Sequence, residues 1–261
     1  MGLYNRSSNF GLALNEASVQ LMASEANMEN AEEEVYFNIS FKTTSPNYYP
    51  LECLLVNQMA YFTGTYPLYN STLNSNNIFE NTFVAKSDKK TFNTISKNLD
   101  KLLTFENDLN YYSSELKYAD KIGSIKVLNS LIAAKKKDIE ELFFKTQNLI
   151  IKKCFTNEFN LIRNLDDIKD FTKKFYNFKD FIGSAENYTY YNEFYRYIME
   201  ELDKKKEYIE AHGEINLFEP ETTSLVLIDS KTSAFAFAHK FITKFKKLFG
   251  FNKDKVDIND F

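Results

Sequence analysis

The side chains best suited to acid–base or metal chemistry in this sequence are two histidines and a group of three aspartates. His212 and His239 are the only histidines. Neither has a cysteine, serine or aspartate at a spacing that is typical of a catalytic triad or a metal site. Asp166, Asp167 and Asp170 lie together at the start of a predicted helix, where carboxylates stabilise the free backbone N–H groups. We therefore interpret the aspartates as helix-capping residues and the histidines as incidental.

Motifs that bind nucleotides, cofactors or metals are absent from the sequence. It contains no glycine-rich phosphate-binding loop, no nucleophile elbow and no closely spaced cysteine pair. Cys53 and Cys154 are too few for a disulfide framework, so we expect both to be reduced and buried. The sequence thus predicts a protein that is not an enzyme and that uses no metal and no cofactor.

Tyrosines are concentrated in one stretch, which is a candidate binding surface. Five of them fall within ten residues: Tyr188, Tyr190, Tyr191, Tyr195 and Tyr197. On a helix they surround the axis, so they cannot all face one core. Tyrosine is favoured at protein interfaces because it buries a large area and keeps a polar tip. We expect some of these rings to contact a partner protein, with a thick intramolecular core as the alternative. Base stacking is disfavoured because the flanking charges are acidic.

The C-terminal part of the chain holds a second candidate surface. A predicted helix over 232–249 places large apolar residues on one side and lysines mostly on the other. Such a helix can bind in the groove of a partner, lie in a membrane interface or cover its own bundle. The tail that follows alternates charges with apolar residues, which suits docking on a neighbouring subunit. The aromatic residues that we assign to partner contacts here are Phe235, Phe241, Phe245, Phe249, Phe251 and Phe261.

Long helices must position these surfaces, and residues 87–154 contain the clearest pair. Apolar residues recur at three- and four-residue steps from Phe92 to Leu109 and again from Ile125 to Leu149, which is the spacing of one helix face. A short connection would fold the second helix back antiparallel to the first. Polar residues occupy three positions of the predicted contact faces: Glu106, Lys135 and Thr146.

The sequence before this helix pair is predicted to form two segments. Residues 1–34 would form an N-terminal arm and a weak helix that ends at Glu32–Glu34. Residues 35–86 would form a strand at 35–41, a short helix and a long Asn/Ser-rich surface loop. A lone strand leaves its backbone groups unpaired, so we expect it to pair with residues 225–228 or with another subunit.

The helix pair would join further helices over 155–165, 166–182 and 184–212 in a bundle over residues 87–213, with Gly213 at the end of the last helix. Residues 214–261 would form an extended segment, the basic amphipathic helix and the tail. The predicted fold is therefore mainly α: an antiparallel helical bundle with long helices, plus one or two short strands and extended N- and C-terminal segments.

Composition narrows the function and the location. The net charge of −4 disfavours general nucleic-acid binding. The sequence has no recognisable secretion signal and no apolar run long enough to span a membrane, so we expect a protein of the cytoplasm or of a virus particle. Asn, Lys, Phe, Tyr and Ile are abundant, and their AT-rich codons predict an AT-rich source genome.

The predicted function is a non-enzymatic structural subunit of a large macromolecular assembly, for which a phage or virus particle component is one concrete version. Its partners would be other protein subunits in a homo- or hetero-oligomer. We expect residues 1–30 and 250–261 to dock on neighbouring subunits, because they hold too few apolar residues to fold alone. The alternative is a peripheral membrane or adaptor protein that acts through the C-terminal basic amphipathic helix.

Overall fold

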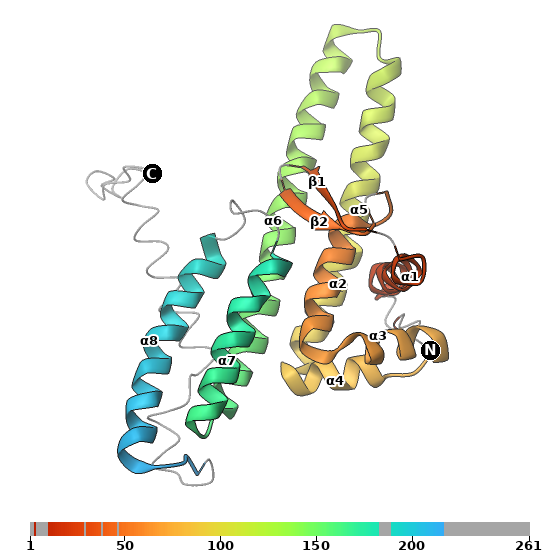
Figure 1. The fold of residues 1–261 in the computed structure, drawn as a ribbon. Helices are drawn as coiled ribbons and strands as arrows, with labels where there is room; N and C mark the ends of the chain where they lie inside the picture. The colour runs from red at the N-terminus through yellow and green to blue at the C-terminus, as the bar shows by residue number, and fades with distance from the viewer. Residues whose placement is uncertain are drawn as a thin grey trace, which may run out of the picture.

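The computed structural model describes Leu3 and residues 10–182 and 189–216, apart from positions 29, 38 and 46. Within these residues the chain forms eight α-helices, one 3-10 helix and a two-stranded antiparallel sheet, which confirms the predicted mainly α fold (Figure 1). In chain order the elements are α1 (Leu12–Ala26), β1 (Glu32–Tyr36), β2 (Ile39–Thr43), α2 (Pro50–Thr63), α3 (Thr65–Asn74), α4 (Ile78–Lys86), α5 (Lys89–Tyr118), α6 (Ile122–Leu161), α7 (Leu165–Asn177), η1 (Phe178–Phe181) and α8 (Thr189–His212).

The two longest helices, α5 and α6, form the predicted antiparallel hairpin, and the other elements pack around its lower part (Figure 1). Asp88 caps α5 by accepting a hydrogen bond from the backbone N–H of Thr91 at 2.7 Å. The face that α5 buries is the predicted one and includes Phe92, Leu99 and Leu109. The periodicity of the sequence therefore identified both the helix and its orientation.

Helix α6 is longer than predicted. We expected the second helix of the pair to end near Cys154 and a separate helix to follow, but α6 continues without a break to Leu161. No glycine or proline interrupts this run, and Phe155 and Phe159 extend the buried face beyond the predicted end. The helix has 40 residues and spans the length of the molecule (Figure 1).

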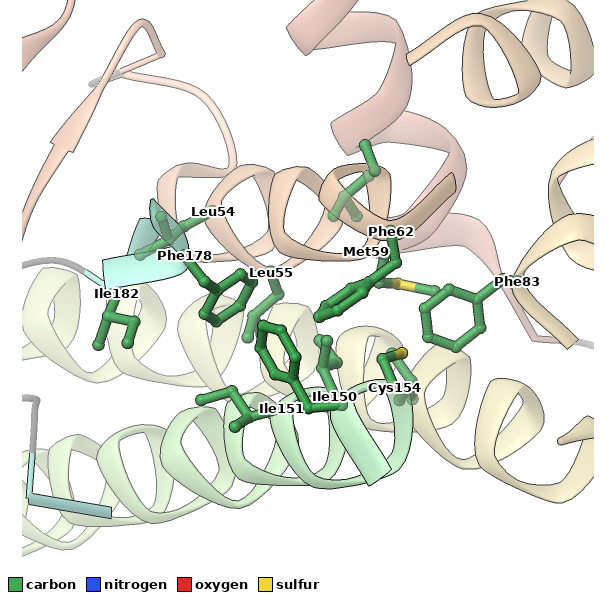
Figure 2. Packing of buried hydrophobic residues seen from close by; sticks show 14 of the residues in the cluster. Leu54, Leu55, Met59, Phe62, Phe83, Ile150, Ile151, Cys154, Phe178 and Ile182 are labelled. Atoms are coloured by element: carbon green, nitrogen blue, oxygen red, sulfur yellow. The ribbon is translucent and has the colours of Figure 1, made fainter. Parts of the chain in front are cut away.

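Helix α2 lies at the centre of the core and is buried on nearly all sides. Pro50 occupies the first turn, where its fixed φ is favourable, and Gly64 adopts a φ of 82° at the C-terminal end. Figure 2 shows the side chains of α2 packed against those of α6, with Phe178 of η1 on one side of this contact and Phe83 of α4 on the other. The residues seen there are Leu54, Leu55, Met59 and Phe62 of α2, Ile150, Ile151 and Cys154 of α6, Phe178, Ile182 and Phe83.

A β-hairpin replaces the single strand that was predicted at 35–41. β1 and β2 pair antiparallel, with Tyr36 opposite Ile39. The chain reverses at Phe37, which has a φ of 50°, so the alternation that is typical of one strand runs through a turn. The partner strand is thus the next one in the chain, so the expectation of a lone strand was wrong. The expected pairing with residues 225–228 or with another subunit stays a prediction. Residues 225–228 lie outside the described part of the chain.

Helix α1 is shorter than predicted and packs against its own chain. It ends well before Glu32–Glu34, which belong to β1, because the chain turns at Met28, which has a φ of 51°. It contacts α2, α3 and α5. The Asp100 carboxylate of α5 caps α1 by accepting hydrogen bonds from the N–H groups of Gly11 and Ala13 at 2.6 and 2.8 Å. The expectation that residues 1–30 are held by neighbouring subunits was therefore wrong for α1.

Two helices, α3 and α4, replace the surface loop that was predicted at 65–86. The polar residues that suggested a loop bond to one another and to the backbone: Ser71 Oγ donates to Asn76 Oδ1 at 3.0 Å and accepts from the N–H of Phe79 at 2.8 Å. Phe79 and Phe83 are fully buried and attach this segment to the core. Local side-chain hydrogen bonds thus make an Asn/Ser-rich sequence compatible with a tight turn between two helices.

Helices α7 and α8 complete the bundle beside the C-terminal half of α6. Asn164 caps α7 by accepting from the N–H groups of Asp166 and Asp167 at 3.0 and 2.9 Å, and the Asp167 carboxylate bonds back to the Asn164 N–H. Gly213, with a φ of 87°, follows α8 as predicted. Described residues from all four predicted segments contribute to one buried core, and the division of the chain into domains stays a prediction.

Candidate functional site

The tyrosine-rich stretch lies at the start of α8 and faces an aromatic cluster of its own chain. Tyr191 is buried, donates a hydrogen bond to the carbonyl oxygen of Phe175 at 2.5 Å and stacks on the Phe175 ring with centroids 5.3 Å apart. Tyr190, Tyr195 and Tyr197 are half-buried and pack against the same core. For Tyr191 the structure supports the intramolecular alternative, and partner contacts of the other rings stay a prediction. Tyr188 lies outside the described residues.

The C-terminal candidates and one histidine also lie outside the described residues. These are His239 and all six aromatic residues assigned to the basic helix and tail, Phe235, Phe241, Phe245, Phe249, Phe251 and Phe261. The other histidine, His212, is exposed at the end of α8, where its Nδ1 is 3.0 Å from the carbonyl oxygen of Tyr208 and its ring stacks on that tyrosine. This geometry is that of a helix-terminal side chain, and among the described residues its hydrogen bond and its ring stacking both involve Tyr208.

The aspartate cluster caps α7, as predicted. Asp167 takes part in the capping box, and Asp166 forms an exposed ion pair with Lys169 at 2.8 Å. Among the described residues no group of three or more histidine, cysteine or carboxylate side chains is arranged to hold a metal ion. Cys53 and Cys154 are both buried free thiols, as expected.

The chemically unusual feature of the described chain is a pair of buried glutamates. Glu52 of α2 is fully buried, and Glu106 of α5 is 5% exposed. Within the described residues neither carboxylate oxygen of Glu52 has a hydrogen-bond partner, and the same holds for Oε1 of Glu106. Burial raises the pKa of Glu52 to about 7. Burial, together with the neighbouring Glu52 carboxyl, raises the pKa of Glu106 to about 9.

Two other ionisable side chains, Tyr36 and Cys53, lie near this pair. Tyr36 of the β-hairpin lies close enough that the two glutamates, after burial itself, raise its pKa. Cys53 follows Glu52 on α2, and burial raises the pKa of its thiol to about 12. The Glu52 charge raises the pKa of Glu106, and among the described residues no cation lowers the pKa of either carboxyl, so at least one of the two keeps its proton at neutral pH.

The two glutamates lie in the core of the described chain. A catalytic carboxyl must come within hydrogen-bond reach of the reacting group. Neither Glu52 nor Glu106 lines the surface grooves that run along α7. The raised pKa of Cys53 also keeps that side chain a thiol rather than a nucleophilic thiolate. The geometry of the described residues therefore supports an ionisable pair inside the core.

A buried lysine was not anticipated from the sequence. Lys205 of α8 is 1% exposed, and its Nζ donates to the carbonyl oxygen of Phe159 at 2.7 Å and lies 4.5 Å from the centre of the Phe159 ring. Burial lowers its pKa to about 8. A lysine with a lowered pKa can act as a nucleophile when it is accessible. Lys205 is enclosed, so its contacts tie α8 to α6 instead. It belongs to a run of three lysines, and nothing in that run marks which one faces inward.

The α5–α6 hairpin extends beyond the rest of the fold (Figure 1). The buried residues nearest to its turn are Leu109 on α5 and Ile139 on α6. None of residues 110–138, which lie between them, is buried. We call these residues the free half of the hairpin. Its root is held by an ion pair between Lys135 and Asp108 at 3.0 Å and by Lys135 over the ring of Phe105. Partly buried apolar residues connect the two helices beyond that point.

No helix of the described residues combines the length and the apolar character that crossing a membrane requires. Comparison with protein-family models, with curated proteins and with solved structures gave no match to this chain.

Proposed function

We propose that this protein is a non-enzymatic structural subunit of a larger assembly and that the free half of the α5–α6 hairpin binds a second copy of the chain. The observation that carries the proposal is the absence of buried residues over 110–138, although this segment forms two regular helices (Figure 1). A partner of the hairpin would bury what the chain itself leaves uncovered.

Energetics support a partner for the free half. Ordering the backbone costs about 1–2 kcal/mol per residue, and most helices in proteins are stabilised by tertiary packing of an apolar face. Among the described residues, the free half packs mainly through the contact between its own two helices. Large apolar side chains point away from that contact and are exposed: Tyr111, Tyr118, Ile122, Val127 and Leu131. Covering them in an interface would offset the cost of keeping the hairpin ordered.

Charge favours a second copy as the partner. Residues 110–138 contain six lysines and three acidic residues, a net charge of +3. Since the whole chain carries −4, the remainder carries −7. The free half of one copy is therefore electrostatically complementary to the rest of another copy, which favours association and makes it sensitive to salt.

Light scattering coupled to size-exclusion chromatography tests the proposal on the full chain. We expect a mass above that of the monomer, and a shift toward the monomer when Val127→Asp and Leu131→Asp are combined. Both side chains are exposed on α6, so the variant should keep the helical circular dichroism of the wild type. Leu73→Asp is the matched control, because Leu73 is an exposed leucine on α3 at a distance from the hairpin, and it should leave the mass unchanged.

Two results would contradict the proposal. One is a wild-type chain that stays monomeric at low salt and micromolar concentration. The other is an oligomer whose mass does not change in the Val127→Asp, Leu131→Asp variant. A monomer that binds anionic vesicles would instead favour the peripheral membrane protein, which would act through the predicted basic helix at 232–249.

A further inference from the structure

A surface groove lies between α7 and α8, away from the hairpin. Its volume is about 590 Å³. It runs from the first turn of α7, at Leu165, toward Tyr176 and is bordered on α8 by Lys206 and Tyr195. Leu165 and Tyr176 are 39% and 63% exposed, so the groove leaves apolar surface uncovered at both of its ends.

Lysines surround this apolar surface. Lys169 and Lys173 of α7 and Lys206 of α8 all line the groove and are exposed. Lys169 is paired with Asp166 at 2.8 Å and Lys206 with Glu210 at 3.8 Å. Lys173 has no ion-pair partner among the described residues. An occupant that combines apolar side chains with carboxylates would match both the floor and the border of the groove.

The chain itself arrives at one end of the groove. After α8 ends, Gly213 turns the backbone, and the N–H of Ile215 donates to the carbonyl oxygen of Arg163 at 2.9 Å. Ile215 is buried. Arg163 lies two residues before the start of α7, so the described chain is anchored beside the Leu165 end of the groove. Figure 1 shows this end of α8 next to the beginning of α7.

We propose that the groove between α7 and α8 binds residues 217–222 of the same chain. The sequence there is Leu-Phe-Glu-Pro-Glu-Thr, in which two large apolar residues precede two carboxylates. Leu217 and Phe218 would cover the apolar floor next to the anchor, and Glu219 and Glu221 would meet the lysines. Pro220 suits an extended segment, because it fixes φ and has no N–H to satisfy. This inference goes beyond the proposed function, which concerns the other end of the molecule.

The length of the segment matches the groove. The stretch of α7 from Leu165 to Tyr176 rises about 16 Å at roughly 1.5 Å per residue. An extended chain advances about 3.3 Å per residue, so five or six residues cover that distance. Since the anchor at Ile215 already holds the chain at the groove's end, binding needs no long loop and little additional loss of entropy.

Tryptophan fluorescence of the full chain tests the proposal, since the sequence contains no tryptophan. In Phe218→Trp the new indole should emit at shorter wavelength and be quenched several-fold less by acrylamide than in the control Tyr66→Trp, because Tyr66 is exposed on α3. Adding Lys173→Glu to Phe218→Trp should weaken binding and shift the emission toward that of the control. A Phe218→Trp indole as exposed as the Tyr66→Trp indole would overturn the proposal.

Disulfide trapping identifies which chain occupies the groove. Thr172→Cys is combined in turn with a cysteine at each position from 217 to 222, while the two buried native cysteines are kept. We expect at least one pair to form a disulfide within the monomer faster than the control pair, in which Lys136→Cys replaces Thr172→Cys. Covalent dimers would mean that a second copy fills the groove, and rates equal to the control would mean that the segment does not bind there. Either result would overturn the proposal.

Discussion

Replacing Glu106 by glutamine should make the protein more stable at neutral pH. Glutamine has nearly the same shape as glutamate and stays neutral at every pH. The side chain at this position is buried beside Glu52, and no described cation compensates it. Glu106→Gln therefore removes a group that must keep its proton in order to remain buried, and it leaves the packing of α5 against α2 in place.

The size of the effect follows from the pKa of Glu106, which burial and the Glu52 carboxyl raise from 4.5 to about 9. The folded state keeps a proton that the unfolded chain releases above about pH 4.5. This group's contribution to stability is therefore complete below that pH and is lost as the pH rises toward 9. At about 1.4 kcal/mol per pH unit, the loss reaches about 3 kcal/mol at pH 7.

Urea denaturation followed by circular dichroism at several pH values measures this difference. Between about pH 5 and pH 7, the free energy of unfolding of Glu106→Gln should rise relative to wild type by about 3 kcal/mol. Glu115→Gln is the matched control, because Glu115 is an exposed glutamate on the same helix. The difference between this control and the wild type should stay within about 0.5 kcal/mol over the same range.

The reasoning would be refuted if the free energies of unfolding of Glu106→Gln and wild type differed by the same amount at every pH in this range. It would mean that the carboxyl ionises in the folded chain as easily as in the unfolded one, and hence that the site is hydrated or that a cation lies nearby. A Glu106→Gln variant that becomes relatively less stable as the pH rises would mean that the ionised carboxylate contributes favourably to the fold.

Two further predictions concern single buried side chains. Leu99→Ala should lower the free energy of unfolding by about 2–5 kcal/mol, since Leu99 is fully buried in the hairpin, whereas Leu73→Ala at an exposed position should change it by less than about 0.5 kcal/mol in the same urea titration. Burial lowers the pKa of Lys205 to about 8, so above that pH the folded chain releases a proton that the unfolded chain retains. Between about pH 8 and pH 10.5 the free energy of unfolding of the wild type should therefore rise by about 3 kcal/mol relative to that of Lys205→Met. A flat difference between these two proteins over that pH range would show that Lys205 stays hydrated.

The helices that the sequence predicted correctly are those that bury one face and expose the other. The apolar stripes of α5, α7 and α8 belong to this class, because contrast between the two faces of a helix creates the periodicity. The burial of Glu106 was also indicated by the sequence, because Glu106 occupies a position at which the spacing of α5 predicts a buried apolar residue. The burial of Glu52 was not indicated by the sequence. Helix α2 is buried on nearly all sides, so its sequence has no contrast between a polar and an apolar face from which a buried carboxylate could be recognised.

The wrong predictions for the residues before α5 come from hydrogen bonds and turns, some local and some between distant parts of the chain, that periodicity does not report. The Asn/Ser-rich stretch forms α3 and α4 because Ser71 and Asn76 satisfy the turn between them. The apolar alternation around Phe37 continues through the reversal of the β-hairpin, so two short strands resembled one. Similarly, Asp100 caps α1 from a helix that is distant in sequence, and no local pattern could have shown that the N-terminal helix is held by its own chain.

The buried glutamate and the proposed interface are connected by position. Glu106 lies less than one turn before Leu109, the last buried residue of α5, so it occupies the root from which the free half of the hairpin extends. Loss of its proton would put an uncompensated charge into the core at that point. The destabilisation should therefore act first on the contact between the hairpin and α2. Helices α7 and α8 contain neither glutamate and pack against the opposite half of α6, so the groove between them should be the less affected region.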